Sequence, residues 1–236
     1  MNIVVTGASR GIGYELVKLY SANANYTIIA LARSEKKLQK LKEECELINP
    51  TSKVIIIPYD LTSNNLSKDV IEEITKHISS INILINNAGA IINRPFQNIT
   101  IEEMEYVYKV NVFSVIRLTQ ALLPIMGLKE RSHIVNISSM GGFQGSAKFA
   151  GLSVYSSSKA ALACLTECLA EELKEKNITV NCLALGATQT EMLNEAFPGY
   201  KAPLSAKEMA SYVANFSLNA HHFINGKILP VSMSTP

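Results

Sequence analysis

The sequence predicts an α/β fold of the doubly wound kind, in which helices cover both faces of a mostly parallel, seven-stranded sheet. Short and nearly continuous apolar segments recur along the chain, and longer amphipathic segments separate them. A strand that is covered on both faces needs continuous apolarity rather than alternation, and strands that alternate with helices form parallel sheets. Right-handed crossovers then produce a three-layer sandwich.

Seven segments have the length and composition of buried strands. Each is rich in Val, Ile or Leu, the residues that fit a pleated and covered surface. They span residues 2–5, 27–31, 54–57, 83–85, 133–137, 178–185 and 227–231. Ligands of such sheets bind beyond the carboxyl ends of the strands, so functional residues are expected directly after each segment.

Six longer segments between the strands have helical periodicity. They span residues 12–22, 34–47, 64–78, 101–126, 155–175 and 205–218. The clearest is the amphipathic stretch that begins at Ser34, a residue type suited to cap a helix. No Pro/Gly/Ser-rich linker or internal repeat interrupts the alternation, so residues 1–236 are expected to form a single domain.

The composition argues against several classes of partner. Of the 236 residues 47% are hydrophobic, and the net charge is only +2. Because Lys and Arg are scattered, we expect no nucleic-acid partner and no membrane partner. No apolar run approaches the roughly 20 residues of a membrane span, and the first residues do not resemble a signal peptide, so a cytoplasmic protein is expected. The four cysteines lack CxxC spacing, and no metal site is expected.

A glycine-rich turn, TGASRGIG at residues 6–13, follows the first predicted strand. Glycines at a strand-to-helix turn let backbone amides and the helix N-terminus approach a pyrophosphate. An ordinary tight loop is the alternative, but the position after the first strand of an α/β chain favours dinucleotide binding. The residues expected to bind the cofactor here are Gly7, Ser9, Arg10, Gly11, Ile12 and Gly13.

Arg33 follows the second predicted strand, where dinucleotide-binding folds distinguish between cofactors. A carboxylate at this point binds the 2′-hydroxyl of NAD, whereas an arginine suits the 2′-phosphate of NADP. No acidic residue ends this strand, and Arg10 adds a second positive charge. Two ordinary surface arginines remain the alternative. The sequence favours NADP (NADPH) over NAD.

Two further motifs lie at the same predicted edge of the sheet. Asp60 and Leu61 follow the third strand, and NNAG, with Asn87, Ala88 and Gly89, follows the fourth. Either motif alone also occurs in ordinary turns. Together they fit an adenine-side carboxylate and a close approach of the backbone to the cofactor.

These motifs, in this order and at these separations, resemble the short-chain dehydrogenase/reductase family over essentially the whole chain. They are TGASRGIG, NNAG, the Asn111 of KVNVFS, the serines of IVNISS, and YSSSK. The resemblance implies a Rossmann-type fold and an NADP(H)-dependent oxidoreductase that interconverts a carbonyl and a secondary alcohol. The organisation is broadly similar to that of 3-oxoacyl-carrier-protein reductases.

Tyr155 and Lys159 of YSSSK stand four residues apart, so they are neighbours on one helix face. A phenol titrates near ~10, and both an adjacent ammonium and the positive end of the helix dipole favour the phenolate. We therefore expect the pKa of Tyr155 to be lowered. The small serines between the two residues leave room for a cofactor. For the pair alone, an ordinary exposed helix face is the alternative.

The family resemblance also assigns roles to these residues. It makes Tyr155 the general acid/base and makes Lys159 the group that tunes Tyr155 and holds the nicotinamide ribose. It makes Ser139 a hydrogen-bond donor to the substrate oxygen, and Asn111 the support of a water that resupplies protons.

The chain departs from the family pattern at three points. Ser138 and Ser139 are adjacent, and only the resemblance selects Ser139. The loop that follows Ser139 is a few residues longer than usual. Leu185–Gly186 stands where the family commonly has Pro-Gly, while Thr190 keeps the position that contacts the nicotinamide end of the cofactor. Gly186 and Thr190 are both expected at the cofactor.

Bulky apolar residues dominate the segments expected to shape the substrate pocket, so a neutral small-molecule carbonyl or alcohol is expected. Ordinary core packing is an equal alternative for these residues. The candidates are Met140, Phe143, Met192, Phe197 and Tyr200.

The resemblance implies a homodimer or homotetramer, because helices 101–126 and 155–175 are the usual oligomer faces of the family. Val112, Leu162 and Leu169 are apolar residues on these helices. The C-terminal VSMSTP lacks the usual Asp-Gly-Gly-like ending. Four basic residues are candidates for contact with a carrier protein, or are simply solvated: Lys129, Arg131, Lys174 and Lys176.

A catalytically silent nucleotide sensor or scaffold protein of the same fold is the alternative function. Loss of the serine, the tyrosine or the lysine would indicate it. Because Ser139, Tyr155 and Lys159 are all present, an enzyme is favoured.

Overall fold

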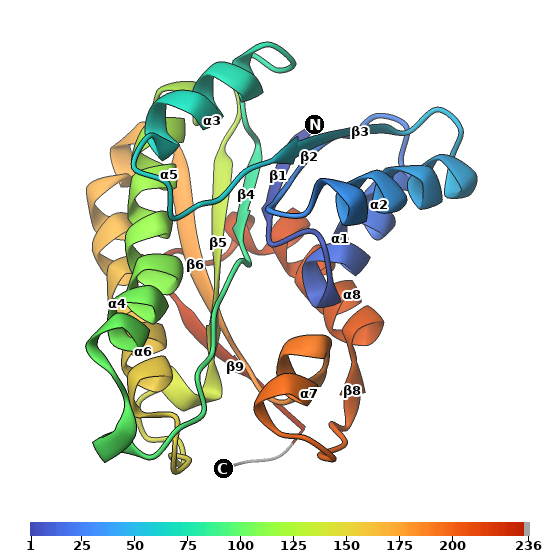
Figure 1. Ribbon diagram of the computed structural model, residues 1–236. Helices are drawn as coiled ribbons and strands as arrows, with labels where there is room; N and C mark the ends of the chain where they lie inside the picture. The colour runs from blue at the N-terminus through green and yellow to red at the C-terminus, as the bar shows by residue number, and fades with distance from the viewer. Residues whose placement is uncertain (234–236) are drawn as a thin grey trace.

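The fold is built on a parallel sheet of seven strands in the order β3-β2-β1-β4-β5-β6-β9 (Figure 1). This is a computed structural model, and it describes residues 1–233; residues 234–236, the end of VSMSTP, lie outside the described part. The strands are β1 (Asn2–Thr6), β2 (Thr27–Ala32), β3 (Lys53–Pro58), β4 (Ile83–Asn86), β5 (Ser132–Ser139), β6 (Ile178–Leu185) and β9 (Ile228–Val231). Each overlaps a predicted segment, so the predicted α/β fold class is confirmed.

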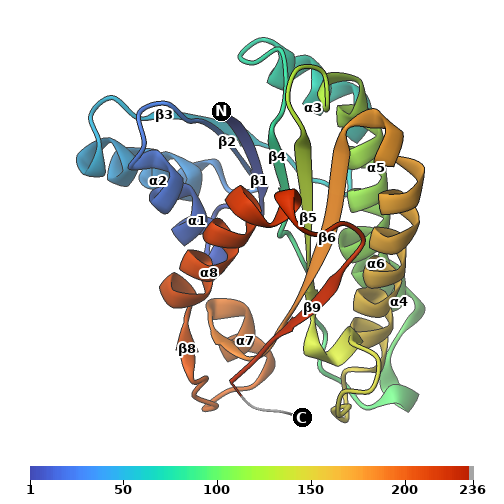
Figure 2. The same cartoon turned by 180° about the vertical axis from the view of Figure 1, so that it is seen from behind.

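Helices cover both faces of this sheet (Figures 1 and 2). The helices are α1 (Gly11–Ser21), α2 (Glu35–Ile48), α3 (Leu66–Thr75), α4 (Ile101–Tyr108), α5 (Ser114–Leu122), α6 (Ser153–Glu172), α7 (Glu191–Ala196) and α8 (Ala206–Asn219). Short 3₁₀ turns lie at Phe96–Asn98, Leu123–Ile125, Met140–Gly142, Lys174–Lys176 and Ala220–His222. Apolar residues of α1, α2 and α8 form the core on one face, and those of α3, α5 and α6 form the core on the other.

The strands are continuously apolar because alternate side chains enter different cores. In β1, Ile3 and Val5 belong to the core under α1, whereas Val4 belongs to the opposite core. In β2, Ile28 and Ile29 divide in the same way, and all five of these residues are fully buried. Successive side chains of a strand point to opposite faces, so a strand between two helical layers needs apolar residues at every position.

Prolines stand in both edge strands of the sheet. Pro58 closes β3 at one edge, and Pro230 lies within β9 at the other, opposite Ala184 of β6. Both prolines are exposed. A proline has no N–H to donate, so in sheets it is largely confined to edges.

The predicted single helix over 101–126 is interrupted. A π-helical turn, Lys109–Phe113, separates α4 from α5, and Asn111 is buried at its centre. The Asn111 side chain hydrogen-bonds Ala90 in the segment after β4 and Ser158 of α6. An inserted residue of this kind widens one helical turn, and here it turns a polar side chain inward.

Three short elements follow β6 that the sequence did not predict. The pair β7 (Thr188–Gln189) and β8 (Leu204–Ser205) forms a separate two-stranded sheet, and α7 lies between the two strands. Elements of two or six residues are too short for a periodic pattern to reveal. Figure 1 shows α7 below the carboxyl end of the main sheet, beneath α8.

Two of the three residues proposed for an oligomer face are wrong. Val112 is only 7% exposed and Leu162 only 1%, so both pack inside the subunit, and Leu169 is half-buried. Phe113, in the turn between α4 and α5, is a large apolar residue near the middle of this helical segment, and it is 52% exposed. Within residues 1–233, no helix has both the length and the apolarity needed to cross a membrane.

Candidate functional site

A cavity of about 530 Å³ lies where the carboxyl ends of the strands meet. It extends from residues that follow β2 and β3, past the turn after β1, to the start of α6. Sixteen of the eighteen residues predicted for the site line it: Gly7, Ser9, Arg10, Gly11, Ile12, Arg33, Asp60, Leu61, Asn87, Ala88, Gly89, Ser139, Tyr155, Lys159, Gly186 and Thr190. The other two, Gly13 and Asn111, lie behind its wall.

Hydrogen bonds fix the position of the glycine turn against the NNAG segment. Thr6 Oγ1 accepts hydrogen bonds from the backbone N–H groups of Asn87 and Ala88, both at 3.0 Å, and Asn87 Nδ2 donates to Thr6 O at 2.9 Å. A Cβ on Gly13 would lie 2.5 Å from both Asn87 Nδ2 and Gly7 O. Gly13 therefore permits close packing between the two segments rather than lining the cavity.

The turn leaves an open cradle at the start of α1. Gly7 and Gly11 adopt left-handed φ angles of 69° and 58°, which favour glycine. Arg10 is the N-cap of α1, but its side chain caps no amide, and no acidic residue lies in the first turn. Backbone N–H groups at such a helix start are suited to bind a phosphate. The cradle therefore fits the pyrophosphate of a dinucleotide.

Positive and negative side chains meet at the end of the cavity formed after β2 and β3. Arg33 is exposed, and its guanidinium lies 3.4 Å from the hydroxyl of Tyr106. Asp60 accepts two 2.8 Å hydrogen bonds from Thr62. Although burial pushes the pKa of Asp60 upward, these hydrogen bonds and the nearby Arg33 outweigh it and hold the pKa below its usual value.

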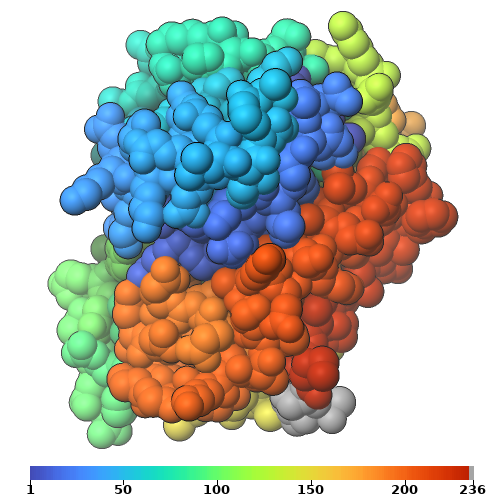
Figure 3. All heavy atoms as spheres, turned by 90° about the vertical axis from the view of Figure 1, so that its right-hand side faces the viewer, coloured from blue at the N-terminus to red at the C-terminus, as the bar shows by residue number. Residues whose placement is uncertain are grey.

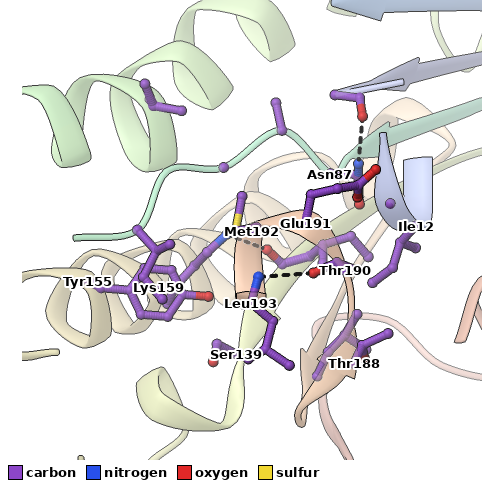
Figure 4. Close-up of a pocket in the computed structure, with 18 of the residues that line it drawn as sticks. Ile12, Asn87, Ser139, Tyr155, Lys159, Thr188, Thr190, Glu191, Met192 and Leu193 are labelled. Carbon is purple, nitrogen blue, oxygen red and sulfur yellow. Dashed lines mark hydrogen bonds between the residues drawn. The ribbon is translucent and has the colours of Figure 1, made fainter. Parts of the chain in front are cut away.

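Three predicted catalytic residues converge at the opposite end of the cavity. Tyr155 and Lys159 occupy the first turns of α6, and Ser139 ends β5 (Figure 4). Lys159 is 4% exposed, and its Nζ donates a 2.7 Å hydrogen bond to Ile137 O. Desolvation lowers the pKa of Lys159 to about 8.

The pKa of Tyr155 differs in direction from the sequence expectation. Burial raises this pKa above its ordinary value, and hydrogen bonding with Ser139 lowers it only in part. The Lys159 ammonium is itself buried and donates to the Ile137 carbonyl. The phenol is therefore neutral at pH 7, which is the state needed to donate a proton.

The side chain of Asn111 makes three hydrogen bonds within the protein. Its Oδ1 accepts from Ala90 N at 2.8 Å, and its Nδ2 donates to Ala90 O and to Ser158 Oγ, both at 2.9 Å. Both amide hydrogens are thus engaged by protein, so a water at Asn111, as the sequence predicts, would donate to one of its oxygens. Gly89, next to Ala90, approaches Lys159: a Cβ there would lie 3.5 Å from Nζ. Asn111 therefore positions the segment that faces Lys159.

The Leu185–Gly186 turn is tight despite the missing proline. Gly186 N donates to Val231 O at 2.8 Å, which ties the end of β6 to β9. A Cβ on Gly186 would lie 2.5 Å from Ser232 Oγ. A side chain at this position would clash, so the glycine is what the close strand approach requires.

Apolar side chains surround the cavity beside Tyr155. Four of the five predicted pocket residues, Met140, Met192, Phe197 and Tyr200, line it. Phe143 does not line it and was wrongly included. Sequence reasoning missed other apolar residues of the lining, among them Ile91, Phe149, Leu152 and Leu193. Phe149 and Leu152 belong to the long loop before α6, and the length of that loop was the available signal.

The short helix α7 closes one side of the cavity. Thr190 caps α7 by accepting a 3.2 Å hydrogen bond from Leu193 N (Figure 4). Glu195 of α7 pairs with Arg10 of the glycine turn, and Asn93 Nδ2 donates to Ala196 O at 2.9 Å. α7 is thus tied both to the glycine turn and to the segment after NNAG.

The four basic residues considered for a carrier protein do not lie at the site entrance. Lys129 and Arg131 precede β5, and Lys174 and Lys176 precede β6. They therefore lie at the amino ends of the strands, whereas the cavity lies at the carboxyl ends. This expectation is wrong because these positions come before their strands rather than after them.

Known proteins share both the sequence pattern and this fold. Residues 1–201 match the short chain dehydrogenase model. The 3-oxoacyl-[acyl-carrier-protein] reductase FabG of Aquifex aeolicus is 31% identical over 243 residues, which cover 97% of this chain and 94% of that protein. The ketoacyl reductase HetN of Nostoc sp. is 31% identical over 192 residues, which cover 80% of this chain and 64% of that protein. The chain belongs to the short-chain dehydrogenase/reductase family.

Solved structures agree with this assignment. A short chain dehydrogenase from Burkholderia cenocepacia in complex with NADP has a TM-score of 0.85 at 27% identity, covering 98% of this chain and 95% of that chain. The L-sorbose reductase of Gluconobacter frateurii, complexed with NADPH and L-sorbose, has a TM-score of 0.88 at 22% identity, covering 99% and 95%. The second likeness shows the fold alone.

Proposed function

We propose that this enzyme is an NADP(H)-dependent reductase that interconverts an apolar carbonyl compound and its secondary alcohol, with Tyr155 as general acid/base. The main observation behind this proposal is that one cavity has arginines toward one end and the predicted catalytic residues at the other. Arg33 lies at one end, Arg10 lies in the glycine turn next to it, and Tyr155, Lys159 and Ser139 lie at the other end.

The residues at the reactive end have the right protonation states for carbonyl reduction. Bound NADPH would supply a hydride to the carbonyl carbon. The neutral phenol of Tyr155 donates its proton to the carbonyl oxygen, and Ser139 donates a hydrogen bond to the same oxygen. Lys159, with a pKa of about 8, remains mostly charged at pH 7 and would hold the nicotinamide ribose.

The cofactor assignment is supported by the cradle and by its charges. The glycine turn and the uncapped start of α1 would hold the pyrophosphate. Arg33 and Arg10 line the end of the cavity where the 2′-phosphate of NADP would lie. Asp60, which is hydrogen-bonded to Thr62 and kept ionised, would face the adenine.

The substrate is proposed to carry a bulky or extended apolar group. Ile91, Phe149, Met192, Phe197 and Tyr200 surround the space beside Tyr155. Two of these rings are prominently exposed at the mouth, Phe149 at 54% and Tyr200 at 50%. Two relatives are a ketoacyl reductase and a 3-oxoacyl-[acyl-carrier-protein] reductase, whose substrates carry acyl chains, and such a chain is compatible with this lining.

Turnover and binding must be measured together to test this function. A panel of apolar, polar and charged ketones and alcohols is assayed with NADPH and NADH, and Tyr155→Phe is compared with wild type. We expect apolar ketones to react, and Tyr155→Phe to lose at least about 100-fold in kcat while it retains NADPH binding by calorimetry. Turnover of charged substrates alone, or a fully active Tyr155→Phe, would contradict the proposal.

We also propose that the enzyme is a homodimer or homotetramer in the cytoplasm. Phe113, in the turn between α4 and α5, is a large ring that remains half exposed on the single subunit. Light scattering at micromolar concentration tests the assembly: a monomeric mass would rule it out, and Phe113→Ser is expected to weaken it.

A further inference from the structure

An ion pair joins the glycine turn to α7 across 185 residues of sequence. Arg10 donates from Nη1 to Glu195 Oε1 at 2.5 Å and from Nη2 to Glu195 Oε2 at 3.2 Å. The two parallel bonds form the bidentate arrangement that guanidinium groups make with carboxylates and phosphates alike. Figure 3 shows the residues of α7, in light orange, packed directly against the N-terminal residues, in blue.

The ion pair lies among positive charges. Arg10 and Arg33 both line the cavity, and Lys37 projects from the first turn of α2. The hydrogen bond from Arg10 is the main cause that lowers the pKa of Glu195, and Lys37 adds a smaller effect in the same direction. Glu195 is thus the anion that this cationic group holds in the structure.

We infer that Glu195 competes with the 2′-phosphate of NADP for Arg10. This competition affects both the cofactor preference and the contact between α7 and the glycine turn. This inference rests on the proposed function. A guanidinium that is occupied through both Nη atoms must release or share them before it can bind a phosphate in the same way. NADH carries no 2′-phosphate, so its binding leaves the Arg10–Glu195 pair intact.

The phosphate wins this competition, but the need to displace Glu195 lowers the affinity for NADPH. The Arg10 and Glu195 side chains are 33% and 61% exposed, so their pair is screened by water. A phosphate with nearly two negative charges would be attracted to Arg10 more strongly than the single carboxylate that it displaces, and Lys37, which already acts on Glu195, would add to this attraction. Removal of Glu195 should therefore tighten NADPH binding by about twofold to fivefold, the range expected for one exposed ion pair.

Calorimetric titration of the full chain with NADPH and with NADH tests this competition. Wild type is compared with Glu195→Gln, Arg10→Ala and the double variant, and thermal melting checks that each is folded. Glu195→Gln should tighten NADPH and leave NADH unchanged. The gain should vanish in the Arg10→Ala background. Adenosine 2′-monophosphate, compared with adenosine 5′-monophosphate, should show the same pattern, because only the former carries the competing phosphate.

Glu171→Gln is the matched control. Glu171 is also an exposed glutamate paired with a cation, Lys174, at 2.5 Å, but it lies at the end of α6 remote from Tyr155. It should leave NADPH affinity unchanged, which excludes a mere effect of net charge. Weaker or unchanged NADPH binding in Glu195→Gln, or an equal gain for NADH, would overturn the inference.

The inference and the proposed function fail in different ways. If wild type prefers NADPH through Arg10 but Glu195→Gln changes nothing, only the competition is wrong. If wild type shows no preference for NADPH, and Arg10→Ala alters neither affinity, the NADP assignment and the competition are both wrong.

Discussion

Asn111 and Ala90 exchange two hydrogen bonds, so that one side chain satisfies both backbone groups of a residue in another segment. Asn111→Ala would leave these buried groups without partners. We expect the free energy of unfolding in urea to fall by about 1–3 kcal/mol. Asn98→Ala, at an exposed position, is the control and should stay within about 0.5 kcal/mol of wild type. Equal effects would show that the Asn111 contacts contribute little.

Gly13→Ala should damage cofactor binding through packing alone. Its new Cβ would lie 2.5 Å from Gly7 O and force the glycine turn away from Asn87. We expect a loss of about 1–3 kcal/mol in stability together with weakened NADPH binding. Gly145→Ala is the contrast: its φ of 81° penalises a side chain, but no atom lies within 4 Å of the new Cβ and the site is elsewhere. It should lose stability and keep NADPH affinity, as calorimetry and thermal melting can show.

Arg33→Ala should reduce the preference for NADPH over NADH. A hydrogen-bonded charge pair with a phosphate corresponds to about a tenfold to hundredfold change in affinity. Tyr106→Phe removes the 3.4 Å contact to Arg33 and keeps the charge, so it should change the preference far less. The Kd values for both cofactors decide the matter, and an unchanged ratio in Arg33→Ala would refute the phosphate assignment.

Acid should destabilise the protein through His133. This buried imidazole is bonded at Nδ1 to Ser217 O and at Nε2 to the Asn181 amide, and desolvation lowers its pKa to about 4. The unfolded chain binds the proton near pH ~6.5, so stability is full above that pH and is lost as pH falls from there toward 4. The loss should be on the order of 3 kcal/mol.

His133→Gln separates this effect from general acid denaturation. Glutamine does not titrate, so urea unfolding between pH 7 and pH 4.5 should show a shallower decline than in wild type. His77→Gln, at an exposed position, serves as the control and should keep the wild-type slope. Parallel slopes in all three proteins would contradict a role for His133.

The seven strands and the cavity edge could be predicted because buried parallel strands need continuous apolarity, and ligand residues follow such strands. The break at Asn111 could not, because the sequence around it keeps helical periodicity and only the contact with Ala90 turns the side chain inward. The pairing of Arg10 with Glu195 was hidden for a similar reason. It joins residues far apart in sequence through a helix, α7, that is too short to show a pattern.

The pKa of Tyr155 illustrates the same limit in electrostatics. The spacing of Tyr155 and Lys159 predicts an ammonium beside a phenol, and the helix does bring them together. The spacing does not reveal that both groups are deeply enclosed, or that Ile137 O accepts from the lysine. Burial then outweighs the attraction expected from proximity.

The prolines at the two margins of the sheet bear on how copies of this chain meet. Each of Pro58 and Pro230 interrupts the row of N–H donors along an edge strand. A further strand therefore cannot pair with either edge of the sheet without losing a hydrogen bond. Growth of the sheet into a fibril is thereby discouraged. In the dimer or tetramer proposed above, contacts between copies of the chain would be made by side chains on the helical layers, where association can stop at a closed assembly of fixed size.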